Sequence, residues 1–435
     1  MRRFKISAIF TIILLVSSAA AWSQIAPGIT DDDRAEFARH REAMFERLGD
    51  ETAVFLGAYR SFGGRFRQES NFYYLTGVEI PMAVLILDGR NDTAILFLAP
   101  ARTGRMAIYN GPTIGPGPEA VAEFGIADVR SVDKLESSLK ERLPEGAAVY
   151  TVLGREYPSF GPVASLPWAG SISTTTLVKG WLEKVVPGHE IKNIKPEIDD
   201  LRRVKSPWEI ARMEEACRIA GEAHVAAFKA THPGITEAEI EGICAAVFLK
   251  NGALRYGYTA IVGAGPNNCV LHYPDSAAVA DDGELVLMDF GPDYRYYISD
   301  ITRTWPVNGK FSPEQRKVYL DVLEIQQKLI DFVKPGVSID DVNALHKKLS
   351  EEKGYGENYI HGPSHYLGID VHDVGDNSKP MEPGVIVTIE PGVYFIDKGW
   401  GVRIEDDILV TAAGRRNLSA DIPRTPDEIE AVMKK

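Results

Sequence analysis

Short apolar runs separated by polar or helical stretches mark the first half of the chain, from about residue 26 to residue 194. Runs bounded in this way are typical of β-strands, and their alternation with helical stretches predicts an α/β domain. The three clearest runs are "TAVFLGA" at 52–58, "MAVLILD" at 82–88 and "TAILFLA" at 93–99.

A strong helix-start pattern follows a polar, charged segment at residues 195–205. Ser206 and Glu209 form the sequence of a capping box, and Pro207 stands at the first helical position, where its missing N–H costs nothing. We expect a long helix from here to about Thr231. A chain of 435 residues is too long for one core. The sequence therefore predicts two domains, 24–200 and 201–435.

The second half of the chain contains a weak internal repeat with a spacing of about 100 residues. Each copy has two helix starts and then an apolar strand that ends in an acid and a turn signal. Such a repeat predicts two αβ halves related by a pseudo-twofold axis. The matching segments are "SPWE" (206–209) with "SPEQ" (312–315), "PGITEAEI" (233–240) with "PGVSIDDV" (335–342), and "GELVLMDFG" (283–291) with "GVIVTIEPG" (384–392).

The repeat relates acids to acids and a histidine to a histidine. An ionised carboxylate at the end of an apolar strand is costly unless it is paired or bound to a metal. Structural ion pairs with Arg295, Arg303 and Arg403 are the alternative to a metal. A pseudo-twofold axis would bring the repeated positions together, where they can share a ligand. The pairs are Asp289 with Glu390, Asp300 with Glu405, and His272 with His372.

Histidines cluster in the same region, since "HGPSHYLGIDVHD" contains His361, His365 and His372. A single histidine is more often a core residue, but neutral imidazole is also the commonest transition-metal ligand. Four carboxylates with one imidazole suit Mn²⁺, Fe²⁺, Co²⁺ or Zn²⁺ better than Ca²⁺ or Mg²⁺. Two bridging carboxylates imply two ions, which activate water and polarise a carbonyl. The residues alone therefore predict a dinuclear hydrolase and leave its substrate open.

The first 23 residues form a separate unit, in which Arg2, Arg3 and Lys5 precede an apolar run and several small residues. This is the pattern of a secretory signal peptide. The run is shorter than the ~20 apolar residues that a membrane-spanning helix needs, although an uncleaved anchor is the alternative. We expect an exported protein, periplasmic or secreted, with no membrane span after cleavage.

Composition and charge indicate an ordinary globular protein and disfavour some kinds of partner. Hydrophobic residues make up 45% of the chain and charged residues 25%, as in ordinary globular proteins. Removing residues 1–23, which carry three positive charges, takes the net charge from −13 to −16. Nucleic acid is therefore disfavoured as a partner. The three cysteines show neither metal-binding spacing nor a disulfide framework, and we expect them to be buried apolar residues: Cys217, Cys244 and Cys269.

At these same residues the chain resembles the pita-bread metallopeptidases, and within them the aminopeptidase P and prolidase branch. The catalytic motifs are "LVLMDFGPDYRYYISDITRTW", "HGPSHYLGIDVHDVG", "VTIEPGVY" and "GVRIEDDI". Two earlier segments, "NFYYLTGVEIPMAVLILDG" (71–89) and "NGPTIGPGPEAVAEFGI" (110–126), resemble the N-terminal domain of aminopeptidase P. The resemblance implies an N-terminal α/β domain followed by a C-terminal pita-bread (creatinase/aminopeptidase) domain.

The resemblance also assigns roles to individual residues. It implies one metal held by Asp289 and Asp300, and a second held by His365 and Glu390. Asp300 and Glu405 would bridge the two ions, which we expect to be Mn²⁺, with Co²⁺, Zn²⁺ and Fe²⁺ as alternatives. The other implied roles are proton exchange for Glu390, substrate binding and proton shuttling for His361 and His372, a place beside the proline-side pocket for His272, and orientation of Asp289 by Arg403 and Tyr394.

The implied activity is metal-dependent hydrolysis of the bond between an N-terminal residue and a following proline. That bond is a tertiary amide without an N–H, so it is a poor substrate for proteases that bind this donor. Three alternatives stay open at this point: a prolidase confined to dipeptides, a hydrolase of non-peptide substrates, and a non-catalytic binding protein on the same scaffold. The expected partners are peptides with proline in second position, and a homo-oligomer stays open.

Overall fold

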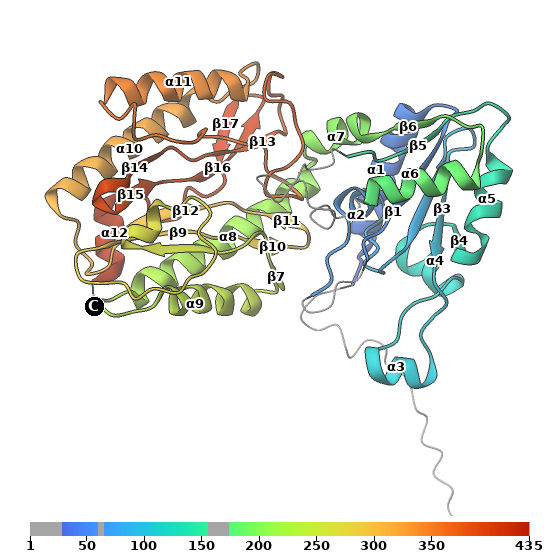
Figure 1. Cartoon of the computed structure of the whole chain (residues 1–435), viewed down its shortest axis with the longest axis horizontal. Helices are drawn as coiled ribbons and strands as arrows, with labels where there is room; N and C mark the ends of the chain where they lie inside the picture. The colour runs from blue at the N-terminus through green and yellow to red at the C-terminus, as the bar shows by residue number, and fades with distance from the viewer. Residues whose placement is uncertain (1–27, 60–64, 155–173, 435) are drawn as a thin grey trace, which may run out of the picture.

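The structure is a computed structural model, which describes residues 28–59, 65–154 and 174–434. The expected signal peptide lies outside these ranges. Figure 1 shows the N-terminal elements and the C-terminal elements as two groups, with helix α7 (Lys195–Arg203) at their junction. The fold class predicted from the sequence, two α/β domains, is confirmed.

The N-terminal group is built on a six-stranded mixed sheet of order β4-β3-β2-β1-β5-β6. The three runs singled out in the sequence form its β1, β2 and β3, which pair antiparallel, whereas the outer strands pair parallel. The strands are β1 (Thr52–Leu56), β2 (Val84–Asp88), β3 (Thr93–Leu98), β4 (Asp128–Ser131), β5 (Val149–Thr151) and β6 (Ile191–Asn193).

Helices cover both faces of this sheet because successive strand residues point to opposite sides. Ala53 and Phe55 of β1 pack with α1, α2 and α4, while Val54 packs with α5 and α6 on the other face. The central strands are consequently buried on both sides. The helices are α1 (Asp31–Leu48), α2 (Ser70–Thr76), α3 (Gly104–Asn110), α4 (Pro118–Phe124), α5 (Leu135–Arg142) and α6 (Thr174–Val185).

The helix predicted after the domain connection is α8 (Pro207–Ala230). Its capping box forms as expected: Ser206 Oγ accepts the Glu209 N–H at 3.2 Å, and the Glu209 carboxylate accepts the Ser206 N–H at 2.8 Å. Thr231 is the C-terminal cap. Helix α8 is the first element of the internal repeat.

The two copies of the repeat fold alike. Each has two capped helices followed by an antiparallel strand pair: β9 with β12 in the first copy and β13 with β16 in the second. The first copy contains α8, α9 (Glu237–Lys250), β7 (Arg255–Tyr256), β8 (Ile261–Ala264), β9 (Leu285–Asp289), β10 (Pro292–Tyr294), β11 (Tyr297–Ile298) and β12 (Thr302–Pro306). The second contains α10 (Pro313–Phe332), α11 (Ile339–Glu352), β13 (Ile386–Ile389), β14 (Gly392–Phe395), β15 (Trp400–Arg403), β16 (Asp406–Thr411) and β17 (Gly414–Asn417), followed by α12 (Pro426–Met433).

The strand pairs meet at the ends that carry the acids. The backbone N–H of Glu405 donates to the carbonyl of Thr302 at 3.1 Å. Two residues further, the Thr304 hydroxyl donates to the carbonyl of Arg403 at 3.0 Å. These contacts join the first copy to the second, as the pseudo-twofold prediction requires, and they hold the acid-bearing ends side by side.

Candidate active site

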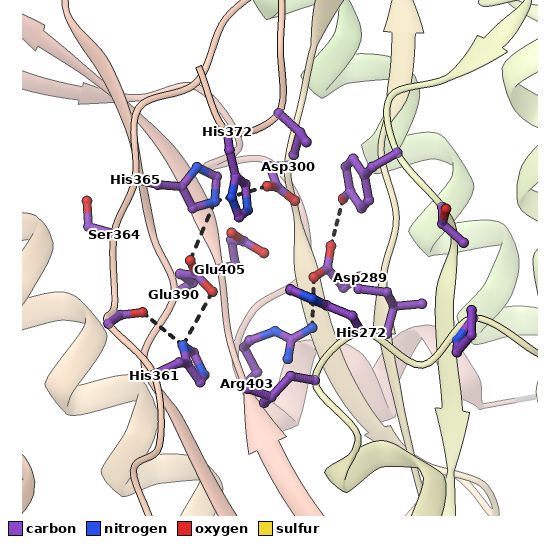
Figure 2. Close-up of a pocket in the computed structure, with 17 residues that line it drawn as sticks. His272, Asp289, Asp300, His361, Ser364, His365, His372, Glu390, Arg403 and Glu405 are labelled. Atoms are coloured by element: carbon purple, nitrogen blue, oxygen red, sulfur yellow. Dashed lines mark hydrogen bonds and ion pairs between the residues drawn. The ribbon is translucent and has the colours of Figure 1, made fainter. Parts of the chain in front are cut away.

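Each copy of the repeat supplies two acids at one end of its strand pair. Asp289 is the last residue of β9, and Asp300 lies just before β12. Glu390 follows β13 directly, and Glu405 lies just before β16. Because the two strand pairs meet at this end, all four carboxylates line one cavity of about 600 Å³. Figure 2 shows them facing a common centre.

The histidine-rich loop is held against β13, which brings His365 to the acids. The N–H of Glu390 donates to the carbonyl of Pro363 at 2.8 Å, and the Thr388 N–H donates to that of His365 at 3.0 Å. His365 Nε2 lies 3.3 Å from Asp300 Oδ2 and 3.5 Å from Glu390 Oε1. The expected ligand set is therefore gathered in one place.

The donor atoms of this cluster are suited to a cation. His365 Nδ1 lies 3.0 Å from the Tyr366 carbonyl and donates its proton there, which turns the Nε2 lone pair toward the carboxylates. Asp300 Oδ1 is buried and has no hydrogen-bond partner among the described residues. Ligand atoms of Asp300, His365 and Glu405 lie within 4.8 Å of one another. Acceptors that face each other in this way need a proton or a metal ion between them.

The pKa values of these groups show the same need for positive charge. Burial raises the pKa of Asp289 and that of Glu390 each to about 7. Burial and the charge of Asp300 raise the pKa of Glu405 well above its usual range. Burial acts to lower the pKa of His365, but its hydrogen bond with Asp300 and the charge of Glu390 raise it to about 9. The residues alone therefore retain protons that divalent ions would replace.

Arg403 and Tyr394 lie behind the acids as expected, but they act in series. The Arg403 guanidinium donates to Asp289 Oδ2 at 2.7 Å and to Tyr394 Oη at 2.9 Å. Tyr394 in turn donates its hydroxyl hydrogen to His361 Nε2 at 2.9 Å. Tyr394 thus reaches Asp289 through Arg403, and its direct contact is with a histidine of the cavity.

The three histidines that are not expected to bind metal lie around the same cavity. Burial lowers the pKa of His361 to about 4, and its Nδ1 lies 3.7 Å from Glu390. The rings of His372 and His365 have their centroids 4.3 Å apart, and those of His372 and His272 6.5 Å apart. Apolar residues line the same cavity: Ile261, Leu271, Pro274 and Val371. The cavity therefore joins an acidic centre to an apolar wall.

Two residues of this site were missed from the sequence. The Tyr258 hydroxyl donates to Asp289 Oδ1 at 2.7 Å, so Tyr258 and Arg403 hold the two oxygens of that carboxylate. The Thr302 hydroxyl donates to Glu405 Oε2 at 2.6 Å. Thr302 stands in the motif "DITRTW", two residues after Asp300, and that proximity was the signal for it, whereas Tyr258 stands in no such motif.

Comparison with known families agrees with both halves of the chain. The model described as metallopeptidase family M24 matches residues 211–412. The model described as aminopeptidase P, N-terminal domain, matches residues 37–150. Each match falls within one of the two groups of elements seen in the structure.

Curated and solved proteins resemble the chain over nearly its whole length. Xaa-Pro aminopeptidase of Escherichia coli K12 is 34% identical, over 93% of this chain and 99% of the relative. A solved putative aminopeptidase P from Bacillus anthracis superposes with a TM-score of 0.83 at 29% identity and covers 92% of this chain and 98% of its own. A zinc-substituted aminopeptidase P of E. coli in complex with product gives 0.80 at 32% identity, over 94% and 99% of the two chains.

Proposed function

This chain belongs to metallopeptidase family M24, and on that premise we propose that it releases the N-terminal residue from peptides whose second residue is proline. It is a metallo-aminopeptidase, a hydrolase of a family that uses divalent metal ions. The observation that carries the proposal is the cavity in which four acids and His365 lie next to three further histidines and an apolar wall.

Two ions fit the donor set. Asp289 and Asp300 would hold one, His365 and Glu390 the other, and Asp300 and Glu405 would bridge them. Support comes from the buried Asp300 Oδ1, which has no hydrogen-bond partner in the described part of the chain, and from the raised pKa values of Asp289, Glu390 and Glu405. When bound, the ions supply Lewis acidity, which polarises the scissile carbonyl and acidifies the attacking water. A mainly oxygen donor set with one nitrogen favours Mn²⁺, with Co²⁺, Zn²⁺ and Fe²⁺ as alternatives.

The protein's own residues would move the protons. Glu390 would accept a proton from the attacking water and return it to the leaving amine. His361 lies 3.7 Å from Glu390 and is held in place by the Tyr394 hydroxyl. His372, which also lines the cavity, would contact the substrate and shuttle a proton at the scissile bond.

The apolar wall would select proline. Ile261, Leu271 and Val371 line the cavity next to His272 and His372, and together they suit a compact apolar ring. The amide before proline has no N–H to satisfy, so the wall needs no acceptor at that point. An apolar pocket by itself discriminates by only ~1–3 kcal/mol per methylene, and we therefore expect a preference for proline with weak cleavage of small residues.

Purified protein with added Mn²⁺ tests the function directly. We expect cleavage of a Xaa-Pro-Xaa peptide and much slower cleavage of the matched Xaa-Ala-Xaa peptide, with release of the first residue only. Cleavage of a Xaa-Pro dipeptide but not of the longer peptide would assign the activity to a prolidase. Absence of cleavage for all three peptides, with two ions bound, would refute a peptidase function.

We also propose export, on the signal-like pattern of residues 1–23. Within the described part of the chain, no helix has the length and apolar character needed to cross a bilayer. Amino-terminal sequencing of protein from the secretory host should give a mature start near Trp22 or Gln24. An intact Met1 on protein recovered from the cytoplasm would contradict export.

A further inference from the structure

The loop that carries His372 has two aspartates beside that histidine, and both are bound by one buried arginine. Arg202 Nη2 lies 2.7 Å from Asp370 Oδ2 and 2.5 Å from Asp373 Oδ1. The Arg202 side chain is only 2% exposed and that of Asp373 only 1%. Arg202 belongs to α7, the helix at the junction of the two groups of elements, so this contact comes from outside the repeat that holds the acids.

We call the contacts of Arg202 with Asp370 and Asp373 the clamp. Residues of the N-terminal sheet domain add to it. The Ser70 hydroxyl, at the start of α2, donates to Asp370 Oδ1 at 2.7 Å. Arg67 donates to the carbonyl of Ile369 at 2.5 Å. Arg202 itself is steadied from this side, because its Nη1 donates to Asn71 Oδ1 at 2.7 Å.

The loop has little regular structure of its own to fix His372. Residues 367–378 contain no helix or strand. The backbone hydrogen bonds nearest to His372 run from the Asp373 N–H to the Tyr366 carbonyl at 3.0 Å and from the Gly368 N–H to the Asp370 carbonyl at 3.2 Å, and both stay within the loop and its start. The position of His372 in the cavity therefore depends on how the side chains of Asp370 and Asp373 are held.

The clamp is suited to hold one geometry. A guanidinium is planar and presents a rigid fork of N–H groups, which fixes direction as well as distance. Lys205 Nζ lies 3.1 Å from the other oxygen of Asp373, so both oxygens of that buried carboxylate have a cationic partner. Burial acts to lower the pKa of Arg202, but the charges of Asp373 and Asp370 outweigh it and raise the pKa above its ordinary value. The fork remains charged across the working pH range.

We propose that Arg202, together with Ser70 and Arg67, positions His372 in the cavity, so that the N-terminal domain is a working part of the catalytic centre. The inference deepens the proposed function, on which it rests for the role of His372. Arg202 acts through the loop and is a positioning residue. Its loss should lower kcat and leave the metal content unchanged.

Arg202→Gln tests the clamp against Arg212→Gln as a matched control. Arg212 is also a buried arginine that joins the two domains, but its ionic partner is Asp33 of α1 and not a residue of the loop that carries His372. We expect Arg202→Gln to keep two ions and to lose ~100-fold in kcat, the scale of an ångström-sized misplacement, with a smaller change in KM. Arg212→Gln should lose stability and keep kcat. Equal loss of kcat in both variants would overturn the proposal.

A double-mutant cycle asks whether Arg202 acts through His372. Once His372→Ala has removed the positioned group, adding Arg202→Gln should cost almost nothing further. Independent, additive losses would overturn the proposal. Arg202→Lys should recover only part of the rate, because an ammonium keeps the charge but lacks the fork. Should Arg202→Gln fail to fold, Ser70→Ala removes one hydroxyl of the clamp and should show a weaker effect of the same kind.

Hydrogen exchange supplies a readout that does not depend on activity. In Arg202→Gln, peptides covering residues 366–375 should exchange faster than in the unmodified protein, whereas in Arg212→Gln they should not. Unchanged exchange in Arg202→Gln would overturn the clamp even in an active enzyme. Faster exchange in a protein that cleaves no Xaa-Pro peptide would retain the clamp and refute the proposed function.

Discussion

The hydroxyl of Thr302 donates a hydrogen bond of 2.6 Å to Glu405 Oε2, and this bond links the first copy of the repeat to a carboxylate of the second. The same hydroxyl oxygen accepts the Arg403 Nε–H at 3.1 Å. Thr302 thus fixes one oxygen of Glu405. It also links Glu405 to Arg403, the arginine that donates to Asp289. The proposed bridging carboxylate is oriented by a residue with no ionisable group.

Replacing Thr302 by valine should weaken metal binding. The change removes the hydroxyl and leaves the Glu405 oxygen and Arg403 Nε without this partner, and loss of such a supporting hydrogen bond typically costs ~10–100-fold in metal affinity or activity. Competition with a chelator of known affinity measures it. Thr304→Val is the control, because Thr304 lies on the same strand but bonds to the backbone of Arg403. Equal metal affinities in the two variants would contradict this role.

Removing the Tyr258 hydroxyl should have a related effect at the other end of the site. Tyr258→Phe leaves Asp289 Oδ1 without its donor, while Arg403 still holds Oδ2. We expect ~10-fold weaker binding of the ion that Asp289 would hold and a smaller effect on the other ion. Calorimetric titration of metal-free protein resolves the two steps. Tyr256→Phe, a partly exposed ring packed on Phe290, should bind both ions normally, and a loss there would point to general destabilisation.

Local signals made much of this fold and site predictable from the sequence. The Ser206 capping box marks the start of α8 because its hydrogen bonds are local. The acids could be paired because the repeat aligns Asp289 with Glu390 at equivalent strand ends. A repeat carries tertiary information in sequence form, since equivalent residues lie in equivalent places.

Contacts between distant segments could not be predicted in that way. Tyr258 reaches Asp289 from a short segment before β8, and Arg202 reaches Asp370 across 168 residues. Neither residue belongs to a repeated pattern, and an arginine in a charged helix such as α7 is usually solvated. Only the folded chain shows that Arg202 is buried.

The bridging roles make a sharp prediction for metal stoichiometry. Asp300→Asn or Glu405→Gln should reduce the bound ions from two to one or none and should abolish measurable cleavage, because a bridging carboxylate serves both ions. Elemental analysis after gentle purification gives the count. Asp397→Asn, an exposed acid of the same half, should keep both ions. Two ions and full activity in either bridging variant would show that the assignment is wrong.

Metal removal should make stability fall as the pH rises. Burial raises the pKa of Asp289 from 3.8 and that of Glu390 from 4.5, each to about 7. Such groups bind protons more tightly in the folded state than in the unfolded state. Their contribution to the free energy of unfolding is therefore full below the pKa of the unfolded state, and it is lost as the pH rises through the pKa of the folded state. Added Mn²⁺ should offset this loss of stability, because the bound ions replace the protons.

Melting temperatures of chelator-treated and Mn²⁺-loaded protein, compared from about pH 5 to about pH 8, measure this effect. The difference between the two should widen with rising pH. Burial acts to raise the pKa of Asp300, but its hydrogen bond with His365 lowers it below the usual value. Asp300 therefore changes stability only at pH values below this window. A difference that narrows as pH rises would contradict the prediction and with it the reading of the acids as a cation site.

The four histidines of the cavity should separate into two classes when they are replaced by alanine. His365 is the one whose Nε2 lies within 3.5 Å of two of the acids, so His365→Ala should lose metal together with activity, since ligand number and geometry determine occupancy. His361 meets Tyr394, and His372 belongs to the clamped loop. His361→Ala and His372→Ala should therefore keep both ions.

Each of these two variants should nevertheless lose rate. We expect ~100- to 10,000-fold where the imidazole transfers a proton, and less where it only positions the peptide. His272→Ala, at the apolar wall, should change KM for proline peptides more than kcat, because it removes wall contact and no reacting group. Metal content and turnover must be measured on the same preparations. An empty metal site in His361→Ala or His372→Ala, with a full one in His365→Ala, would reverse the assignment of the metal ligand. Unmodified cleavage rates in both His361→Ala and His372→Ala would show that neither histidine takes part in the reaction.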